Sequence, residues 1–279
     1  CFINDAKEES VNTILEMAEY KKSGSCKVLV VTGCMAQRYK NEIIEEVPEV
    51  DAVLGTTSYG DILKAIHEAM EGKHFQEFKD IDYLPEKLGK RVLTTGGHFG
   101  YLKIAEGCDK HCTYCIIPKL RGKFRSVPME RLVTQAKEMA EEGVKELILV
   151  AQETTVYGTD IYGKKSLHIL LKELCKIKGI RWIRVLYCYP EEIYDELIQT
   201  MKEEKKICHY LDLPIQHASD RILKRMGRRT TQAELVEIVN KLRREIPDIV
   251  LRTTLISGFP GETQEDHEEL MGFVDEMEF

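Results

Sequence analysis

The sequence lacks any long hydrophobic run, which argues against a membrane-spanning helix. Its longest apolar stretches, near residues 28–31 and 147–151, are far shorter than the roughly 20 residues that cross a bilayer. No signal-peptide pattern opens it, and its composition is not that of a disordered, collagen-like or coiled-coil chain. Because the sequence starts at Cys1 rather than Met and stops at Phe279 within an amphipathic stretch, we expect an internal fragment.

An excess of positive charge is also missing. The chain carries 40 Lys and Arg against 47 Asp and Glu, a net charge of −7. Phosphate affinity comes from Lys and Arg, so such a chain suits a basic protein partner better than RNA. Two short basic runs, within 119–125 and 221–229, oppose this trend, and each is either a solvated face or part of a binding site.

The remaining composition is that of a globular protein. With 279 residues, 43% of them hydrophobic, the chain can form about two domains. In residues 1–75, helical spacing over 5–20, 37–46 and 61–70 alternates with short apolar runs at 27–32 and 50–54. This alternation predicts a truncated, doubly wound α/β domain. Residues 76–97 show no clear period, and we interpret them as a linker.

From residue 98 the alternation becomes regular. The predicted strands are 101–105, 146–150, 182–187, 210–214 and 249–256. The predicted helices are 129–142, 191–202, 232–245 and 264–277. Five successive βα units predict a partial (β/α) barrel over 98–279, and in such barrels the chemistry lies at the carboxyl ends of the strands.

Nine cysteines are an odd number in a chain too long and too charged for a small disulfide scaffold. Reduced thiols in a cytoplasmic protein, some of them metal ligands, fit better. Three of them form the segment Cys108-x3-Cys112-x2-Cys115, directly after the first predicted barrel strand. Three thiolates so close together can hold a cubane [4Fe–4S] cluster and leave one iron open. A zinc site that includes His111 is the alternative, although structural zinc usually takes two separated ligand pairs.

With Tyr114 before its last cysteine, this segment resembles the signature of the radical S-adenosylmethionine (SAM) superfamily. The resemblance implies that SAM chelates the open iron, and that its cleavage yields a radical able to abstract hydrogen from an unactivated carbon. It implies no side-chain acid or base in catalysis. The residues that it assigns to SAM binding are Tyr114, Gln152, Glu153, Gln216, Ser219 and Gly258.

Local structural roles are the alternatives for some of these residues. Tyr114 is equally consistent with a packing aromatic, and Gln152 and Glu153 with a cap or a turn. Ser219 is also a candidate for the N-cap of the next helix. Gly258 lies in a tight glycine-containing loop, through which the backbone can approach an adenine closely.

The segment 30–38 resembles the amino-terminal domain of the radical SAM methylthiotransferases, which hold a second [4Fe–4S] cluster with three cysteines. Cys34 matches the third of these ligands, and a merely packed cysteine is the alternative. The second ligand normally has one residue between it and a Phe, whereas Cys1 directly precedes Phe2. The ligand therefore lies one residue upstream of the chain, or Cys1 itself is the ligand.

Several segments resemble the branch of this family that modifies ribosomal protein S-twelve more than the branch that modifies tRNA: 115–122, 150–158 and 210–220. Asp212 opens an Asp-x-Pro-x-Gln-His-Ala run, where the tRNA branch tends towards His-x-Pro-x-Gln-Ser-Gly. The segment 252–262 fits both branches, but its first residues, beginning with Arg252, resemble those of the protein branch.

The resemblance implies methylthiolation of the β-carbon of an aspartyl residue in ribosomal protein S-twelve, with two [4Fe–4S] clusters and SAM as cofactors. It implies an electron donor such as flavodoxin or ferredoxin, no membrane partner, and no direct RNA binding by this part of the protein. A carboxyl-terminal β-barrel domain of the family is not in the sequence. The alternatives are a tRNA adenosine methylthiotransferase with the same chemistry and a non-catalytic iron–sulfur carrier.

Overall fold

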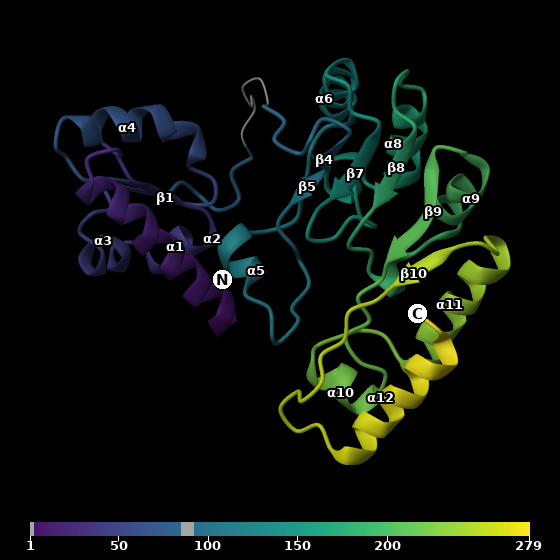
Figure 1. Ribbon diagram of the computed structural model, residues 1–279. Coiled ribbons are helices and arrows are strands. Elements are labelled where there is room, and N and C mark those ends of the chain that lie inside the picture. The colour runs from purple at the N-terminus through teal and green to yellow at the C-terminus, as the bar shows by residue number, and fades with distance from the viewer. Residues whose placement is uncertain (1–2, 85–91) are drawn as a thin grey trace. The chain divides into compact units, whose positions relative to one another are not determined.

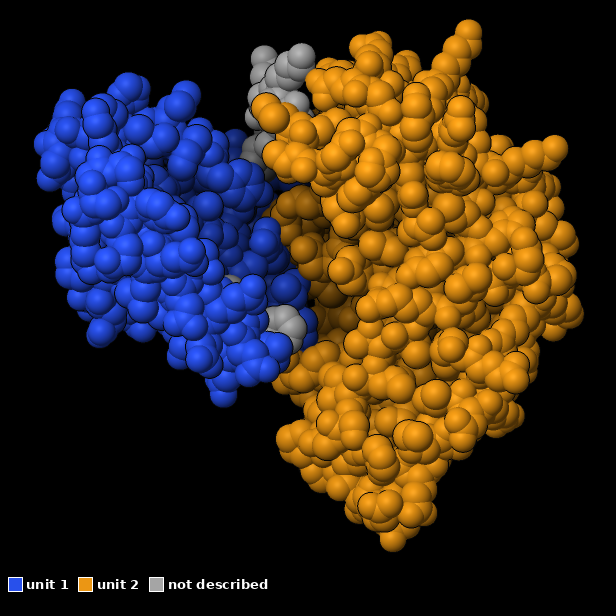
Figure 2. All heavy atoms as spheres, in the orientation of Figure 1, with its two compact units in different colours: residues 1–91, 115–123 blue, residues 92–114, 124–279 orange. Residues whose placement is uncertain are grey.

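A computed structural model describes residues 3–84 and 92–279 of the protein (Figure 1). The chain divides into two compact units, which Figure 2 distinguishes by colour. Unit 1 comprises the described residues of 1–91 together with 115–123, and unit 2 comprises 92–114 and 124–279. This division differs from the sequence-based one because a short segment after the cysteine triplet packs with the amino-terminal part of the chain.

Unit 1 is a three-stranded parallel sheet in the order β1-β2-β3. Its strands are β1 (Val30–Thr32), β2 (Ala52–Leu54) and β3 (Phe75–Glu77). Its helices are α1 (Asn4–Lys22), α2 (Cys34–Tyr39), α3 (Glu42–Glu46), α4 (Ile62–Met70) and α5 (Ile117–Arg121), with a 3₁₀ turn over Tyr59–Asp61.

Alternate residues of these strands face opposite sides of the sheet. Val31 and Val53 pack with Ala18 of α1 and Ala36 of α2, whereas Leu54 packs with α4. Helices therefore cover both faces of the sheet, with α4 on one side of β1 and α1 and α3 on the other (Figure 1). This arrangement confirms the predicted doubly wound α/β fold.

Two details of unit 1 differ from the sequence prediction. The single helix expected over 37–46 is split into α2 and α3, because Lys40 adopts a left-handed backbone with φ of 45°. Strand β3 begins at Phe75 and extends into the region interpreted as a linker. The pairing of β3 with β2, rather than any local period, makes these residues a strand.

Unit 2 contains a five-stranded, all-parallel sheet in the order β10-β9-β8-β7-β4. Its strands are β4 (Phe99–Lys103), β7 (Glu146–Val150), β8 (Trp182–Val185), β9 (Ile207–Asp212) and β10 (Val250–Arg252). The helices that follow them are α6 (Met129–Glu141), α8 (Leu167–Cys175), α9 (Asp195–Glu203), α11 (Gln232–Glu245) and α12 (Gln264–Met277). This succession confirms the predicted partial barrel of five βα units.

Shorter elements surround the carboxyl ends of these strands. They are the antiparallel pair β5 (Ala105–Glu106) and β6 (Arg125–Ser126), the helices α7 (Thr159–Tyr162) and α10 (Asp220–Arg225), and a 3₁₀ turn over Pro190–Glu192. Helix α8 was not predicted from the sequence, although its buried Leu167, Leu170, Leu171 and Leu174 repeat with the period of a helix. Among the described helices, none is both long and apolar enough to cross a membrane.

The two faces of the five-stranded sheet have different environments. One face is covered by the helices, where Leu102, Leu149 and Ile183 contribute to the largest core cluster. The other face, which we call the open face, consists of the strand residues one position out of phase with that core. They include Tyr101, Glu146, Ile148, Trp182, Arg184, Tyr210, Asp212, Val250 and Arg252. The open face therefore combines aromatic and charged side chains.

Candidate functional site

The cysteine loop, residues 107–113, follows β4 and β5 at the carboxyl end of the sheet. Gly107 opens the loop with φ of 80°, and its backbone N–H donates to Oε1 of Gln152 at 2.8 Å. The N–H of Thr113 donates to the carbonyl of Met226 at 2.9 Å. Gln152 follows β7, so the loop is held from neighbouring strand ends. Gln152, expected to bind SAM, therefore positions the backbone next to Cys108.

Gly227 explains how closely the loop can approach the end of α10. Its φ is +74°, and a Cβ at this position would lie 2.8 Å from the carbonyl oxygen of His111. Only a residue without a side chain allows this approach without displacement of the loop. The sequence analysis did not single out Gly227, because its neighbour lies more than a hundred positions earlier in the chain.

Unit 2 contains a cavity of about 420 Å³ next to this loop. Both Cys108 and Cys112, which are buried, line it, so the structure brings two of the predicted cluster ligands to one cavity. The other side chains that matter for its chemistry are Lys110, Glu153, Tyr189, Glu192 and Arg228.

Glu153 places a buried carboxylate at the cavity. The side chain is 1% exposed, and its Oε1 accepts the backbone N–H of Thr155 at 3.0 Å and the hydroxyl of the same residue. Its Oε2 has no hydrogen-bond partner. Burial raises the pKa of Glu153 to about 7, although Thr155 and Lys110 lower it. A cationic ligand that reached Oε2 would therefore stabilise the ionised carboxylate.

Arg228 places a buried cation at the same cavity. Its guanidinium stacks 4.2 Å from the ring centroid of Tyr189, and its Nη2 lies 3.3 Å from Oε2 of Glu191. Its Nε and Nη1 are buried without a partner. The hydroxyl of Tyr189 lies 3.4 Å from the sulfur of Cys112. The walls of the cavity thus contain a carboxylate and a guanidinium with atoms that lack hydrogen-bond partners, and charges of both signs suit a ligand with both an ammonium and a carboxylate group.

The thiols themselves do not form a single-ion site. Within residues 3–84 and 92–279, no three His, Cys, Asp or Glu side chains converge as the ligands of one metal ion would. A four-iron cluster takes its thiolates at separate corners, so its ligands stand farther apart than those of one ion. Cys115 begins the segment 115–123, which packs with unit 1. The thiol donors and the unsatisfied groups of the cavity fit a cluster with bound SAM.

Cys34 occupies the carboxyl end of β1 in unit 1. Gly33, with φ of 97°, turns the chain so that Cys34 becomes the first residue of α2. Nε of Arg121 donates to its sulfur at 3.1 Å. The hydroxyl of Thr56 binds the carbonyl of Leu120 at 2.8 Å, which holds the segment with Arg121 in this unit. Cys1 lies outside the described residues.

The other predicted SAM residues lie near the ends of β9 and β10. Gln216 adopts a left-handed backbone with φ of 71° and bridges to Leu255. Ser219 is buried and precedes α10; its hydroxyl donates to Oδ1 of Asp266 at 2.7 Å and makes no capping hydrogen bond with the helix. Gly258 is exposed with φ of 75°. The ring of Tyr114 meets that of Phe259 edge to face at 6.5 Å.

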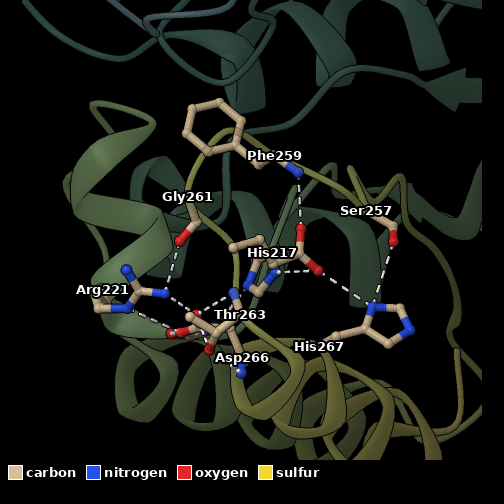
Figure 3. A network of polar contacts seen from close by, with 10 residues as sticks. His217, Arg221, Ser257, Phe259, Gly261, Thr263, Asp266 and His267 are labelled. Carbon is tan, nitrogen blue, oxygen red and sulfur yellow. Dashed lines mark hydrogen bonds and ion pairs between the residues drawn. The ribbon is translucent and has the colours of Figure 1, made fainter.

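A polar network holds the turn after β10 (Figure 3). Asp266 at the start of α12 pairs with Arg221 and accepts from Ser219 and Thr263, and these contacts hold the pKa of Asp266 well below its usual range. Glu262 accepts the backbone N–H of Phe259 at 2.8 Å. The network fixes the segment that carries Gly258 and the aromatic partner of Tyr114.

Nδ1 of His267 lies 3.2 Å from the Glu262 carboxylate, and Nε2 of the fully buried His217 lies 3.6 Å from it. Burial would raise the pKa of Glu262, but the backbone N–H of Phe259 and the two histidines outweigh it and hold the pKa below its usual value. These histidines support the turn from β9 and α12. This role could not be predicted from the sequence, since the spacing of the histidines matches no ligand pattern.

Similarity to known proteins agrees with this geometry. Residues 102–274 match the radical SAM superfamily, and residues 1–55 match an uncharacterized protein family, UPF0004. The chain is 69% identical over 279 residues to a Lachnoclostridium phytofermentans protein named ribosomal protein uS12 methylthiotransferase RimO. That alignment covers 100% of this chain and 63% of the relative. A relative of the same name from Clostridium botulinum is 55% identical, over 99% of this chain and 62% of its own length.

Two solved structures share the fold. One is the cobalamin-dependent S-adenosylmethionine radical enzyme OxsB with aqua-cobalamin and S-adenosylmethionine bound, with a TM-score of 0.63 and 14% identity over 96% of this chain and 42% of that one. The other is the radical S-adenosylmethionine methyltransferase TsrM from Kitasatospora setae, with a TM-score of 0.54 and 18% identity. That match covers 65% of this chain and 34% of TsrM. At these identities the likeness concerns the fold alone. Since the superfamily match extends over more than half of its length, the chain belongs to the radical SAM superfamily, as the cysteine triplet predicted.

Proposed function

We propose that the protein is a radical SAM methylthiotransferase that replaces a hydrogen on the β-carbon of an aspartyl residue in ribosomal protein uS12 with a methylthio group. The names of the relatives and the protein-branch motifs of the sequence support this proposal. The chain spans a little under two thirds of the length of those relatives. We place the reaction in the cytoplasm, with flavodoxin or ferredoxin as electron donor, because thiolate-held clusters need reducing conditions.

The cavity beside the cysteine loop is the observation that carries the proposal. Cys108 and Cys112, together with Cys115, would hold a [4Fe–4S] cluster with one open iron. When bound, this cluster supplies the electron that cleaves SAM and so enables hydrogen abstraction. Glu153 would bind the ammonium of SAM through Oε2, and Arg228 its carboxylate through Nε and Nη1, because these atoms are buried without partners.

The side chains of the cavity would orient SAM and exclude water. An ammonium next to Oε2 favours ionised Glu153, so SAM binding at neutral pH would release a proton from this carboxyl. Tyr189 stacks on Arg228 and contacts Cys112, so one ring supports both the carboxylate site and a cluster ligand. In unit 1, Cys34 would be a ligand of a second [4Fe–4S] cluster, with Arg121 donating to its sulfur.

The test uses the protein at the full length of its gene, with its clusters reconstituted anaerobically. It is incubated with SAM, a reductant and either ribosomal protein uS12 or tRNA, and mass spectrometry follows each substrate. We expect 5′-deoxyadenosine and one added methylthio group on the ribosomal protein. Replacement of Cys108, Cys112 and Cys115 by Ala should abolish both products, whereas Cys26→Ser should abolish neither. Modified tRNA with unmodified protein would identify the rival substrate, and a reduced cluster that never cleaves SAM would identify a carrier.

A further inference from the structure

An ion pair joins the carboxyl ends of β9 and β10 on the open face of the sheet. Asp212 and Arg252 are direct neighbours in the strand register, and Nη1 of Arg252 donates to Oδ1 of Asp212 at 2.6 Å. Their exposures are very different. The Asp212 side chain is 2% exposed, and that of Arg252 is 58% exposed. A buried carboxylate therefore pairs with a cation that is more than half exposed at the end of β10.

The exposed part of Arg252 retains hydrogen-bonding capacity. A guanidinium has five N–H donors in a planar fork, and the described contact to Asp212 uses Nη1. The hydrogen bond and charge of Asp212 raise the pKa of Arg252, so the side chain stays cationic. Asp212 also fixes the orientation of the fork, which reduces the entropy lost when a second carboxylate binds.

The neighbouring arginine on this face shows the contrast. Nε of Arg184 donates to the Glu146 carboxylate at 2.7 Å, and its guanidinium lies over the Tyr210 ring at 4.9 Å. Arg184 is thus covered by an acid and an aromatic ring, and its side chain is less exposed than that of Arg252. Tyr187, at the end of β8, is exposed and holds a left-handed backbone with φ of 59°. Arg252 therefore presents its charge beside aromatic surface at the end where barrel chemistry takes place.

We propose that Arg252, oriented by Asp212, binds the carboxylate of the aspartyl side chain that the enzyme modifies. This inference rests on the proposed function and identifies the residue that selects an acidic target. An adenosine has no carboxylate for Arg252 to bind, so the pair favours a protein substrate.

The test compares two peptides that carry the target region of ribosomal protein uS12 and differ only in having Asp or Asn at the modified position. The full-length, reconstituted enzyme is assayed for kcat/KM on both. A hydrogen bond between charged groups discriminates by roughly 10- to 100-fold, so we expect wild type to prefer the Asp peptide by that factor. Arg252→Lys keeps the charge but loses the planar fork, so it should lose most of this preference through a higher KM.

Two further variants guard against a purely structural effect. The double variant Arg252→Gln with Asp212→Asn leaves no unpaired buried charge and should treat both peptides nearly equally. Arg244→Gln removes an arginine of similar exposure, 66%, from the outer helix α11 and should keep the wild-type preference. Melting temperature and cluster absorbance check that each variant is folded and loaded.

The outcomes separate the two proposals. If wild type modifies the Asp peptide and both Arg252 variants keep its preference over the Asn peptide, the role of Arg252 is refuted while the proposed function stands. If wild type cleaves SAM but modifies neither the peptide nor the intact ribosomal protein, the proposed function and the inference both fall. Loss of preference in the Arg252 variants but not in Arg244→Gln supports the inference.

Discussion

The carboxyl of Glu153 allows a sharp test of the cavity by the substitution Glu153→Gln. In the folded protein the side chain is 1% exposed, and burial raises its pKa from 4.5 to about 7. Gln resembles the protonated carboxyl in shape and polarity but does not titrate. The variant should therefore match wild type where Glu153 is protonated and exceed it where Glu153 is ionised.

The magnitude follows from linkage between proton binding and folding. Below about pH 4.5 both states of wild type are protonated at this site, and the pKa shift has no effect. Between pH 4.5 and 7 the unfolded chain loses the proton while the folded protein keeps it, so wild type loses stability as pH rises. A shift of this size corresponds to about 3 kcal/mol. The unfolding free energy of Glu153→Gln should thus exceed that of wild type by about 3 kcal/mol at pH 8 and by only about 1 kcal/mol at pH 5.

Urea unfolding of the cluster-free protein between pH 5 and 8.5 measures this difference. Glu192 lines the same cavity and is the matched control. Burial would raise the pKa of Glu192, but its ion pairs with Lys110 and Lys165 outweigh burial and lower it. Glu192→Gln should therefore destabilise the protein at neutral pH, the opposite sign. A difference between Glu153→Gln and wild type that stays constant from pH 5 to 8.5 would refute the reasoning.

Three further predictions address the loop, the second cluster and the polar network. Gly227→Ala should cost roughly 2 kcal/mol or more in urea unfolding because its Cβ meets the His111 carbonyl, whereas Gly163→Ala, with a similar φ and open space, should cost only about 1. Cys34→Ala should lower the iron of the reconstituted protein from about eight to about four atoms per chain, and Cys26→Ala should leave it unchanged. Asp266→Asn should lower the melting temperature at pH 7, and the difference should shrink only as the pH falls below 3.8, because Arg221 depresses the pKa of Asp266 in the folded state.

Elements with strong local signals were predicted almost to the residue. Helices α11 and α12 begin and end where the apolar period predicted, and each starts with a capping box, from Thr231 and Thr263. Strand β7 also coincides with its predicted range. Strand β3 and the break between α2 and α3 escaped prediction, because the first depends on pairing with β2 and the second on the backbone of one residue, Lys40.

The candidate site also contains residues with a local sequence signal and residues whose role depends on the fold. Cys108, Cys112 and Cys115 lie within a few consecutive residues. Their spacing therefore indicates a set of cluster ligands from the sequence alone. Arg228 belonged to a basic run whose simpler interpretation was a solvated face. Only the fold buries its guanidinium against Tyr189 and leaves two of its nitrogens without partners.

Ser219 shows how a residue distant in sequence engages a side chain whose role the sequence left open. Its place at the end of β9 suited either SAM or a helix cap. Its hydroxyl donates to Asp266, which lies 47 positions later in the chain, and makes no capping hydrogen bond. Glu153, by contrast, satisfies one oxygen within its own turn and leaves the other buried without a partner. Because a buried polar atom without a partner costs free energy, the unsatisfied oxygen makes Glu153 a stronger candidate for a ligand contact than its residue type alone does.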